Sequence, residues 1–444
     1  FIDEASLKWQ QSKSDWALIA NEIKLRTEQQ QPSPFHLNLI RRNKHTELIA
    51  NDVDLNTITQ LFSLFSATKE TTLLANTNVS GDVSSLHISW PDEADMMAYV
   101  DVDNFSFLPE VANNKAYLGL SDLALKGAWK GNEGRFLLTG LNGELDTQDT
   151  FIKPIKYDTL EIISDIKLSS EGTEVWMPEI RLENNDRKIK ANAQYLSYDD
   201  AHLSVFAEIV GPSQGKIPNY LPKYLIGDNT LSYLNRSIKK GRGELTQVVI
   251  DGNPSDMPFD VKDPNKQGTF LVTAGLKDTF FEFSEDWPAL RNLDATLIVD
   301  KMDMYINAHS GDISDLKVNN DVFAHIDLAA QSTVLKLDIQ PDNLEFSKFH
   351  SLVKRTPLED SIGDVFEFVL LEGKGDAKVH LSIPLSDGPD ESGEIPEFLV
   401  RGDVLTKKAG LQLPSLNLNI QDLSSAVSFE NAAFAIKNAS GLWN

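Results

Sequence analysis

Apolar and polar residues alternate along most of this chain. Ser204 and Glu208 belong to the polar phase of residues 203–209, whose apolar phase consists of Leu203, Val205, Ala207 and Ile209. Successive side chains of a β-strand point to opposite faces of its sheet, so a period of two predicts a strand with one apolar and one solvated face. We therefore expect this segment to lie in a sheet that buries one of its two faces.

The same alternation continues to the end of the sequence. Its apolar phases contain Phe270, Val272, Met304, Ile306, Leu335, Leu337, Ile339, Val379, Leu381, Ile383, Leu416, Leu418 and Ile420. The first half of the chain contains further predicted strands, at residues 16–26, 35–41, 47–55, 86–90, 97–102, 117–129, 134–141 and 162–168. The chain is therefore predicted to be mainly β, with antiparallel strands joined by short turns.

A sheet with one apolar face poses a physical problem, because that face must be covered. The sheet can fold over on itself as a sandwich or barrel. Alternatively, an apolar ligand can fill the space beside it. The alternation of residues leaves both solutions open.

The clearest predicted helix lies within residues 217–259. It can begin at one of three capping residues, Asp228, Asn229 or Thr230. Its apolar stripe has helical spacing and contains Leu231, Leu234 and Ile238. Gly241 is a natural end for it, and a strand over 245–250 follows. We interpret it as a cap or crossover, and we predict shorter helices at 56–67 and 358–371.

Boundaries between domains are faint in this sequence. The best linker candidates are residues 211–218 and 251–267, which contain several prolines and glycines. We therefore divide the chain into a β-rich part at 1–216, a helix-containing insertion at 217–259, and a continuing β-rich part at 260–444.

Composition narrows the classes of function. The 444 residues carry a net charge of −25, which disfavours nucleic acid and docking on an anionic bilayer surface through a basic face. The chain has no cysteine, so disulfides and thiolate chemistry are absent, as suits an oxidising compartment. No signal peptide or membrane-spanning run is visible. Because the sequence begins with Phe1, we expect a piece of a longer protein whose membrane anchor lies elsewhere.

Motifs for catalysis or metal binding are weak. The eight histidines are scattered and form no helical metal-binding pair. Residues 211–215 match G-x-S-x-G, but Pro212 and the antiparallel surroundings disfavour a nucleophile elbow at Ser213. Residues 101–104 and the acidic loop 387–394 lack the complete pattern of a calcium loop. We therefore predict no catalytic residue, no metal site and no cofactor.

A set of residues around the predicted helix carries a family resemblance. It comprises Tyr220–Pro222, Ser232–Leu234, Gly241, Gly252, Pro258, Phe259, Gly268–Phe270, Phe280–Phe283 and Trp287–Leu290. The pattern resembles the YhdP proteins of the AsmA-like superfamily of Gram-negative bacteria, most specifically over residues 220–308. Met257 departs from it, since a bulkier aromatic is expected before Pro258.

The resemblance implies a fold and a role. YhdP-like proteins are expected to be anchored in the inner membrane by an N-terminal helix and to cross the periplasm as a long, twisted, curved antiparallel sheet. Its concave face forms a hydrophobic groove, with a few short helices. They are not enzymes; their implied partners are phospholipids, the inner membrane, and the outer membrane or its proteins. Phospholipid transport between the two membranes would support outer-membrane lipid homeostasis and the permeability barrier.

This implied role agrees with simple energetics. Each buried CH₂ is worth about 0.8 kcal/mol, so two acyl chains leaving a bilayer face a penalty on the order of 20 kcal/mol. A continuous apolar groove removes most of that penalty. The resemblance favours a groove over a closed core, and its predicted lining is the apolar phase named above, from Leu203 to Ile420.

One alternative belongs to another class of function. An exposed sheet edge could pair with an incoming strand, as in a periplasmic scaffold or chaperone for outer-membrane protein assembly or secretion. The two functions differ in cargo: a conduit carries lipid, whereas a chaperone carries unfolded β-rich chains.

Overall fold

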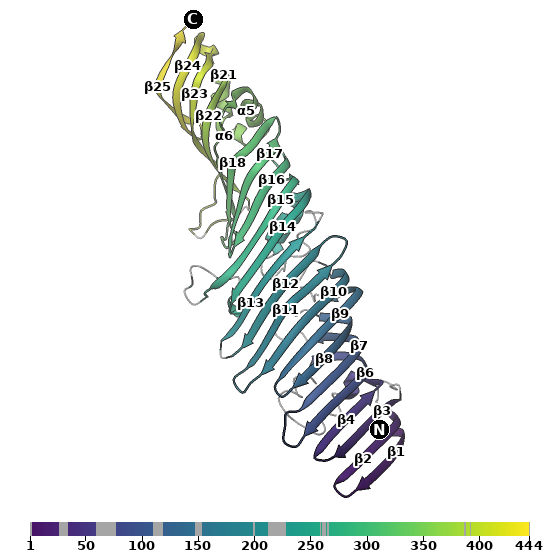
Figure 1. Cartoon of the computed structure of the whole chain (residues 1–444). Coiled ribbons are helices and arrows are strands. Elements are labelled where there is room, and N and C mark those ends of the chain that lie inside the picture. Colours follow the sequence, from purple (N-terminus) through teal and green to yellow (C-terminus); the bar gives the residue numbers. More distant parts are fainter. Residues whose placement is uncertain are drawn as a thin grey trace. The chain divides into compact units, whose positions relative to one another are not determined.

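The computed structural model describes residues 2–25, 34–58, 77–109, 119–146, 153–198, 200–211, 228–257, 259, 263, 266–385, 388–390 and 392–443. Most of these residues form β-strands, and the strands whose partners are defined pair antiparallel (Figure 1). Helices are few and short. The prediction of a mainly β chain with antiparallel strands is therefore confirmed.

The chain forms two compact units. The first consists chiefly of Phe1–Ile209, and the second chiefly of Gly227–Val249 and Asp256–Asn444. One strand, β14 (Ile238–Gly252), contributes residues to both units. The predicted role of residues 217–259 as a separate insertion stays a prediction.

The first unit is a ladder of antiparallel strands. Each strand pairs with the next in the series β1, β2, β3, β4, β6, β7, β8, β9, β10, β11 and β12, and β5 pairs with β6. The strands of this part of the chain are β1 (Ile2–Ser12), β2 (Asp15–Leu25), β3 (Phe35–Arg42), β4 (His45–Asn51), β5 (Val53–Asp54), β6 (Thr77–Pro91), β7 (Met97–Pro109), β8 (Gly119–Lys130), β9 (Glu133–Asp146), β10 (Ile155–Leu168), β11 (Thr173–Glu183), β12 (Lys188–Ser197) and β13 (Ala201–Val210).

Tight turns join many of these strands. Arg42 pairs with His45, and the two residues between them, Asn43 and Lys44, have φ angles of 48° and 63°. A two-residue turn with positive φ at both positions matches the right-handed twist of the strands it joins. The local sequence therefore supports a hairpin at this point.

One face of the first unit is apolar and buried. Val83 and Val102 are fully buried and pack with Phe35, Ala50 and other side chains in one cluster. A second cluster, over β8 to β11, contains Leu123, Tyr157 and Leu160 among others. The other face carries ion pairs such as Arg135–Asp165, whose Nε and Oδ1 atoms lie 2.6 Å apart. The predicted one-sided sheet is therefore present in this unit.

The second unit is a second antiparallel ladder. The pairing runs through β15, β16, β17, β18, β19, β22, β23, β24 and β25, with β20 paired to β22 and β21 to β23. These strands are β15 (Gly268–Phe281), β16 (Leu290–Asp300), β17 (Asp303–Ile313), β18 (Leu316–Asp327), β19 (Val334–Ile339), β20 (Leu344–Glu345), β21 (Leu370–Glu372), β22 (Lys374–Pro384), β23 (Leu399–Leu413), β24 (Leu418–Glu430) and β25 (Ala433–Trp443).

Three α-helices accompany this sheet among the described residues: α4 (Asp228–Ser237), α5 (Phe346–Val353) and α6 (Leu358–Phe368). The predicted helix at 358–371 corresponds to α6. The sequence pattern did not predict α5. Two short 3-10 turns, η2 (Pro254–Asp256) and η3 (Pro414–Leu416), complete the elements.

The helix predicted around residue 231 is shorter than expected. It begins at Asp228, one of the three predicted capping residues, but ends at Ser237, and Ile238 opens β14 instead of closing the apolar stripe. The carbonyl of Ser237 accepts a hydrogen bond from the backbone N–H of Glu282, so pairing with the chain beyond β15 replaces the next helical turn. Gly241 lies within β14 and is therefore not a helix end. A Cβ at Gly241 would lie 2.6 Å from Thr279 Oγ1.

The predicted strand phase at Leu416 is also wrong. Leu416 lies in η3 and is 71% exposed, because Pro414 has no backbone N–H for a ladder and Asn417 has a left-handed backbone with a φ of 49°. The strand begins two residues later, at Leu418.

Several predicted features lie outside the described residues. They include residues 59–67 of the first predicted helix, residues 212–215 of the G-x-S-x-G match, part of the acidic loop at 387 and 391, and residues 220–222 of the family pattern.

A glycine in the first unit gives a test of its packing. A Cβ at Gly140 would lie 2.6 Å from Leu123 Cδ2 and 2.7 Å from Tyr157 Oη, and both of these side chains are almost fully buried. Because neither can move into solvent, Gly140→Ala should lower the free energy of unfolding by about 1–3 kcal/mol. Gly388→Ala is the control, since a Cβ there meets nothing within 4 Å. Denaturant titration followed by circular dichroism measures both, and equal stability of the two variants would contradict this packing.

Candidate functional site

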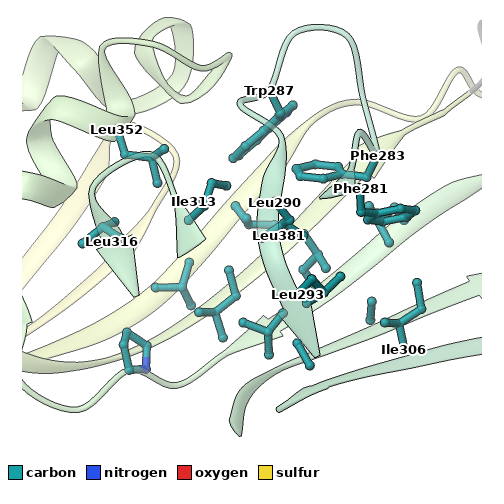
Figure 2. A pocket seen from close by; sticks show the side chains of 18 of the residues that line it. Phe281, Phe283, Trp287, Leu290, Leu293, Ile306, Ile313, Leu316, Leu352 and Leu381 are labelled. Carbon is teal, nitrogen blue, oxygen red and sulfur yellow. The ribbon is translucent and has the colours of Figure 1, made fainter. Parts of the chain in front are cut away.

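The apolar face of the second unit contains two neighbouring cavities. The first has a volume of about 160 Å³ and lies over β15 to β23, with walls that include Phe281, Trp287, Leu337 and Leu381. Figure 2 shows Phe281, Phe283 and Trp287 gathered beside Leu290 and Ile313 at this cavity. The second has a volume of about 220 Å³ and lies between α5, α6 and strands β22 to β25.

The two cavities are adjacent. Leu344, Phe349 and Val379 line both, so the cavities lie side by side along the apolar face of this unit. We call this pair of cavities the apolar groove. Strands β15 to β24 supply its floor because their apolar phases point to the same face, and α5 supplies Phe349 from the other side.

Polar groups are scarce in the groove. Lys317 is the one charged side chain among its described lining residues, and the other polar side chains there are Tyr233, Trp287, Ser425 and Asn431. An apolar cavity of about 150 Å³ stays dry and accepts apolar ligands. The groove can therefore take up hydrocarbon.

Six of the predicted lining residues meet in the first cavity. They are Ile306, Leu335, Leu337, Ile339, Val379 and Leu381. Phe270, Val272 and Ile383 are buried in strands β15 and β22 without lining either cavity, and Met304 borders a separate, more polar cavity beside α4. Contact of these residues with lipid stays a prediction.

The remaining predicted residues lie elsewhere. Leu203, Val205 and Ile209 are partly buried on β13, in the first unit, and do not border the groove. Leu416 is exposed in η3, and Leu418 and Ile420 are partly buried on β24. Ile420 packs against a buried cluster that includes Phe346 and Leu423.

Much of the lining was not predicted from the strand pattern. Phe346, Phe349 and Ile362 come from α5 and α6, and Phe281, Phe283 and Trp287 come from the end of β15 and the loop after it. The dense aromatic residues between 280 and 287 were a usable signal, because large aromatic side chains seldom cluster in a solvated turn.

Aromatic side chains connect the two sides of this sheet on which its strands end. Strand β15 ends and β16 begins on the first side, so Trp287 lies in a loop there. Phe398 precedes β23 on the second side, where β22 ends beside β19. The ring centroids of Trp287 and Phe398 are nevertheless 6.5 Å apart, and Phe283 lies 5.6 Å from Trp287. The loop before β16 and the segment before β23 therefore meet across the groove.

Helix α4 also extends between these two sides of the sheet. The carbonyl of Ser237, at the end of the helix, accepts a hydrogen bond from Glu282 on the first side. Tyr233 borders a cavity together with Leu328, Thr333 and Leu385 on the second side. Tyr233 also lines the apolar groove. Burial raises the pKa of the Tyr233 phenol to about 12, although Ser237 and Arg236 oppose the shift. Helix α4 therefore contributes a side chain to both cavities, and its predicted role as a cap stays a prediction.

The solvated face of the same sheet is polar. Lys277 pairs with Asp294, Lys407 with Asp376, and His325 with Asp303, all across neighbouring strands. Such exposed pairs contribute little stability individually, but they keep this face wetted while the opposite face is apolar. Among the residues that the structure describes, no helix is long and apolar enough to cross a membrane.

Comparison with known proteins supplies the family context. The family model described as YhdP protein matches residues 2–444. The intermembrane phospholipid transporter YhdP of Escherichia coli strain K12 is 25% identical over 245 residues, which is 55% of this chain and 18% of that protein. The chain thus spans less than a fifth of this relative's length. No solved structure matches the chain.

The position of Tyr233 can be tested by its titration. The difference between the alkaline ultraviolet titrations of wild type and Tyr233→Phe should have a midpoint near pH 12, against about 10 in the urea-unfolded chain. The folded protein holds this proton more tightly than the unfolded chain, so the associated stability is lost as the pH rises from about 10 to about 12. A midpoint near 10 in the folded protein would contradict burial of the Tyr233 phenol.

Proposed function

Because the chain belongs to the YhdP protein family, we propose that it is part of a phospholipid carrier and that it holds acyl chains in the apolar groove of its second unit. The adjacency of two apolar cavities that share Leu344, Phe349 and Val379 is the observation that carries this proposal. The name of the Escherichia coli relative supports phospholipid as the cargo.

Transfer free energies favour this use of the groove. An acyl chain that leaves a bilayer exposes its methylene groups to water at about 0.8 kcal/mol each. A groove lined by leucine, isoleucine, valine and phenylalanine returns most of that free energy. Such a protein needs no chemical step, and the proposed role is accordingly non-enzymatic.

The lining also suits movement along the groove. Dispersion and hydrophobic contacts are non-directional, so a chain that slides past Leu337 or Val379 exchanges one apolar neighbour for another. A polar lining would instead hold the ligand at discrete hydrogen bonds. The scarcity of polar groups in the groove therefore supports passage of hydrocarbon as well as its retention.

The cellular setting belongs to the same proposal. We place the chain in the periplasm of a Gram-negative bacterium, attached to the inner membrane by a segment outside residues 1–444 and directed toward the outer membrane. The absence of cysteine suits that compartment, and the charge of −25 keeps the polar face of the sheet hydrated. Transport between the membranes would then maintain the lipid balance of the outer membrane.

Substitution inside the groove tests passage. Leu337 lines the groove and is partly buried, so Leu337→Glu places a charge in the path of the acyl chains while the side chain retains access to solvent. We expect lipid transfer between donor and acceptor vesicles to fall at least tenfold. Ser382→Glu is the matched control, because it adds the same charge on the other face of the sheet. Ser382 pairs there with Lys336 of the neighbouring strand. Unchanged transfer in a folded Leu337→Glu variant would contradict the proposal.

Photo-crosslinking tests the cargo. A benzophenone amino acid at Leu337 should capture phospholipid in cells, because this position lines the groove, whereas the same group at Lys336 faces the opposite side of β19 and should not. Mass spectrometry of the adducts measures both. Adducts with β-rich outer-membrane polypeptides in place of lipid would favour the strand-pairing scaffold instead.

A further inference from the structure

The apolar groove adjoins a cavity of mixed polar and apolar lining on the second unit. This second space has a volume of about 520 Å³, and its walls include Ser232, Arg236, Gln331 and Thr333. We call it the rim cavity. Tyr233 lines both the rim cavity and the apolar groove, so the two spaces meet at one side chain.

We propose that the rim cavity binds the phosphate of a glycerophospholipid whose acyl chain lies in the apolar groove, with Arg236 as the phosphate contact. This inference rests on the proposed function and adds a headgroup site to it. The juxtaposition of an apolar and a polar space at Tyr233 is the arrangement that an amphipathic ligand requires.

The chemistry of the rim cavity fits a phosphate. Arg236 brings a planar guanidinium whose N–H groups match phosphate oxygens in pairs. Gln331 and Ser232 are exposed and make no side-chain hydrogen bond in the described part of the chain, so their amide and hydroxyl groups are available as donors. None of the described residues that line this cavity is an aspartate or a glutamate.

Arg236 is held in place from two sides. Its guanidinium carbon lies 5.9 Å from the centroid of the Tyr233 ring, and Nη1 lies 3.2 Å from Glu285 Oε1. The Glu285 side chain is 80% exposed, so water screens this ion pair and a phosphate can compete with it. Glu285 therefore positions the guanidinium while no ligand is present.

Stacking on Tyr233 places the charge at the boundary of the groove. The ring covers apolar side chains of the groove, whereas Arg236 remains about half exposed on the solvent side. A phospholipid whose chain passes beneath Tyr233 can therefore keep its phosphate in contact with water and with Arg236.

Competition between two lipids with identical acyl chains tests the site. The purified chain is incubated with equimolar dioleoyl phosphatidylethanolamine and dioleoylglycerol, and native mass spectrometry gives the ratio of the two bound species. A charge-assisted hydrogen bond predicts a ratio of roughly ten in the wild type, since about 1.4 kcal/mol corresponds to tenfold. Arg236→Gln should reduce the ratio to about one without loss of bound diacylglycerol.

Three variants complete the design. Arg236→Lys should retain part of the preference, because it keeps the charge. Glu285→Gln should increase the preference, because it removes the competing carboxylate. Arg242→Gln is the matched control: it removes an exposed arginine of β14 that is paired with Asp278 and lines neither cavity.

Each outcome bears on the proposal. An unchanged ratio in Arg236→Gln, or equal binding of both lipids by the wild type, would overturn the headgroup site and leave the transport proposal intact. Failure of the wild type to bind either lipid would overturn both. Arg236-dependent binding of oleate in preference to phospholipid, or of inorganic phosphate alone at the lipid's concentration, would assign the site to a fatty acid or to the free ion.

Discussion

The need to cover one apolar face governs the second unit. Its strands carry apolar residues in one phase and charged residues in the other, so the sheet cannot expose both faces equally. Pairing into a second sheet would bury the apolar face completely. Here α4, the loop containing Trp287 and the helices α5 and α6 cover it only in part, and two apolar cavities of about 160 and 220 Å³ remain beneath them.

The incomplete cover explains how one surface can serve stability and binding together. Side chains such as Phe270 and Val272 are buried without bordering either cavity of the groove. Leu337 and Ile306 are partly buried and border open space. A ligand that fills this space completes the burial that the fold leaves unfinished, so occupancy should stabilise the unit as any ligand of the native state does.

The polar elements of the unit are arranged around that groove. Ion pairs between neighbouring strands, such as Lys277–Asp294, lie on the opposite face and keep charge away from the hydrocarbon path. Arg236 and Tyr233 belong to α4 and lie at the boundary between the apolar groove and the rim cavity. The polar face of the sheet therefore serves solubility, and its apolar face serves the proposed ligand binding.

The sequence by itself determined the strand-rich class, the apolar and polar phases of strands such as β17 and β19, and a helix that begins at Asp228, Asn229 or Thr230, because alternation and capping are local properties. It also placed six residues of the first cavity, from Ile306 to Leu381, in the apolar phase of their strands, and their contact with lipid stays a prediction. Only the tertiary structure decided where the helix ends, since the bond from Glu282 to Ser237 joins distant residues. It alone brought Trp287 to Phe398 and Phe349 to Val379, because contacts across a groove depend on strand order and not on spacing along the chain.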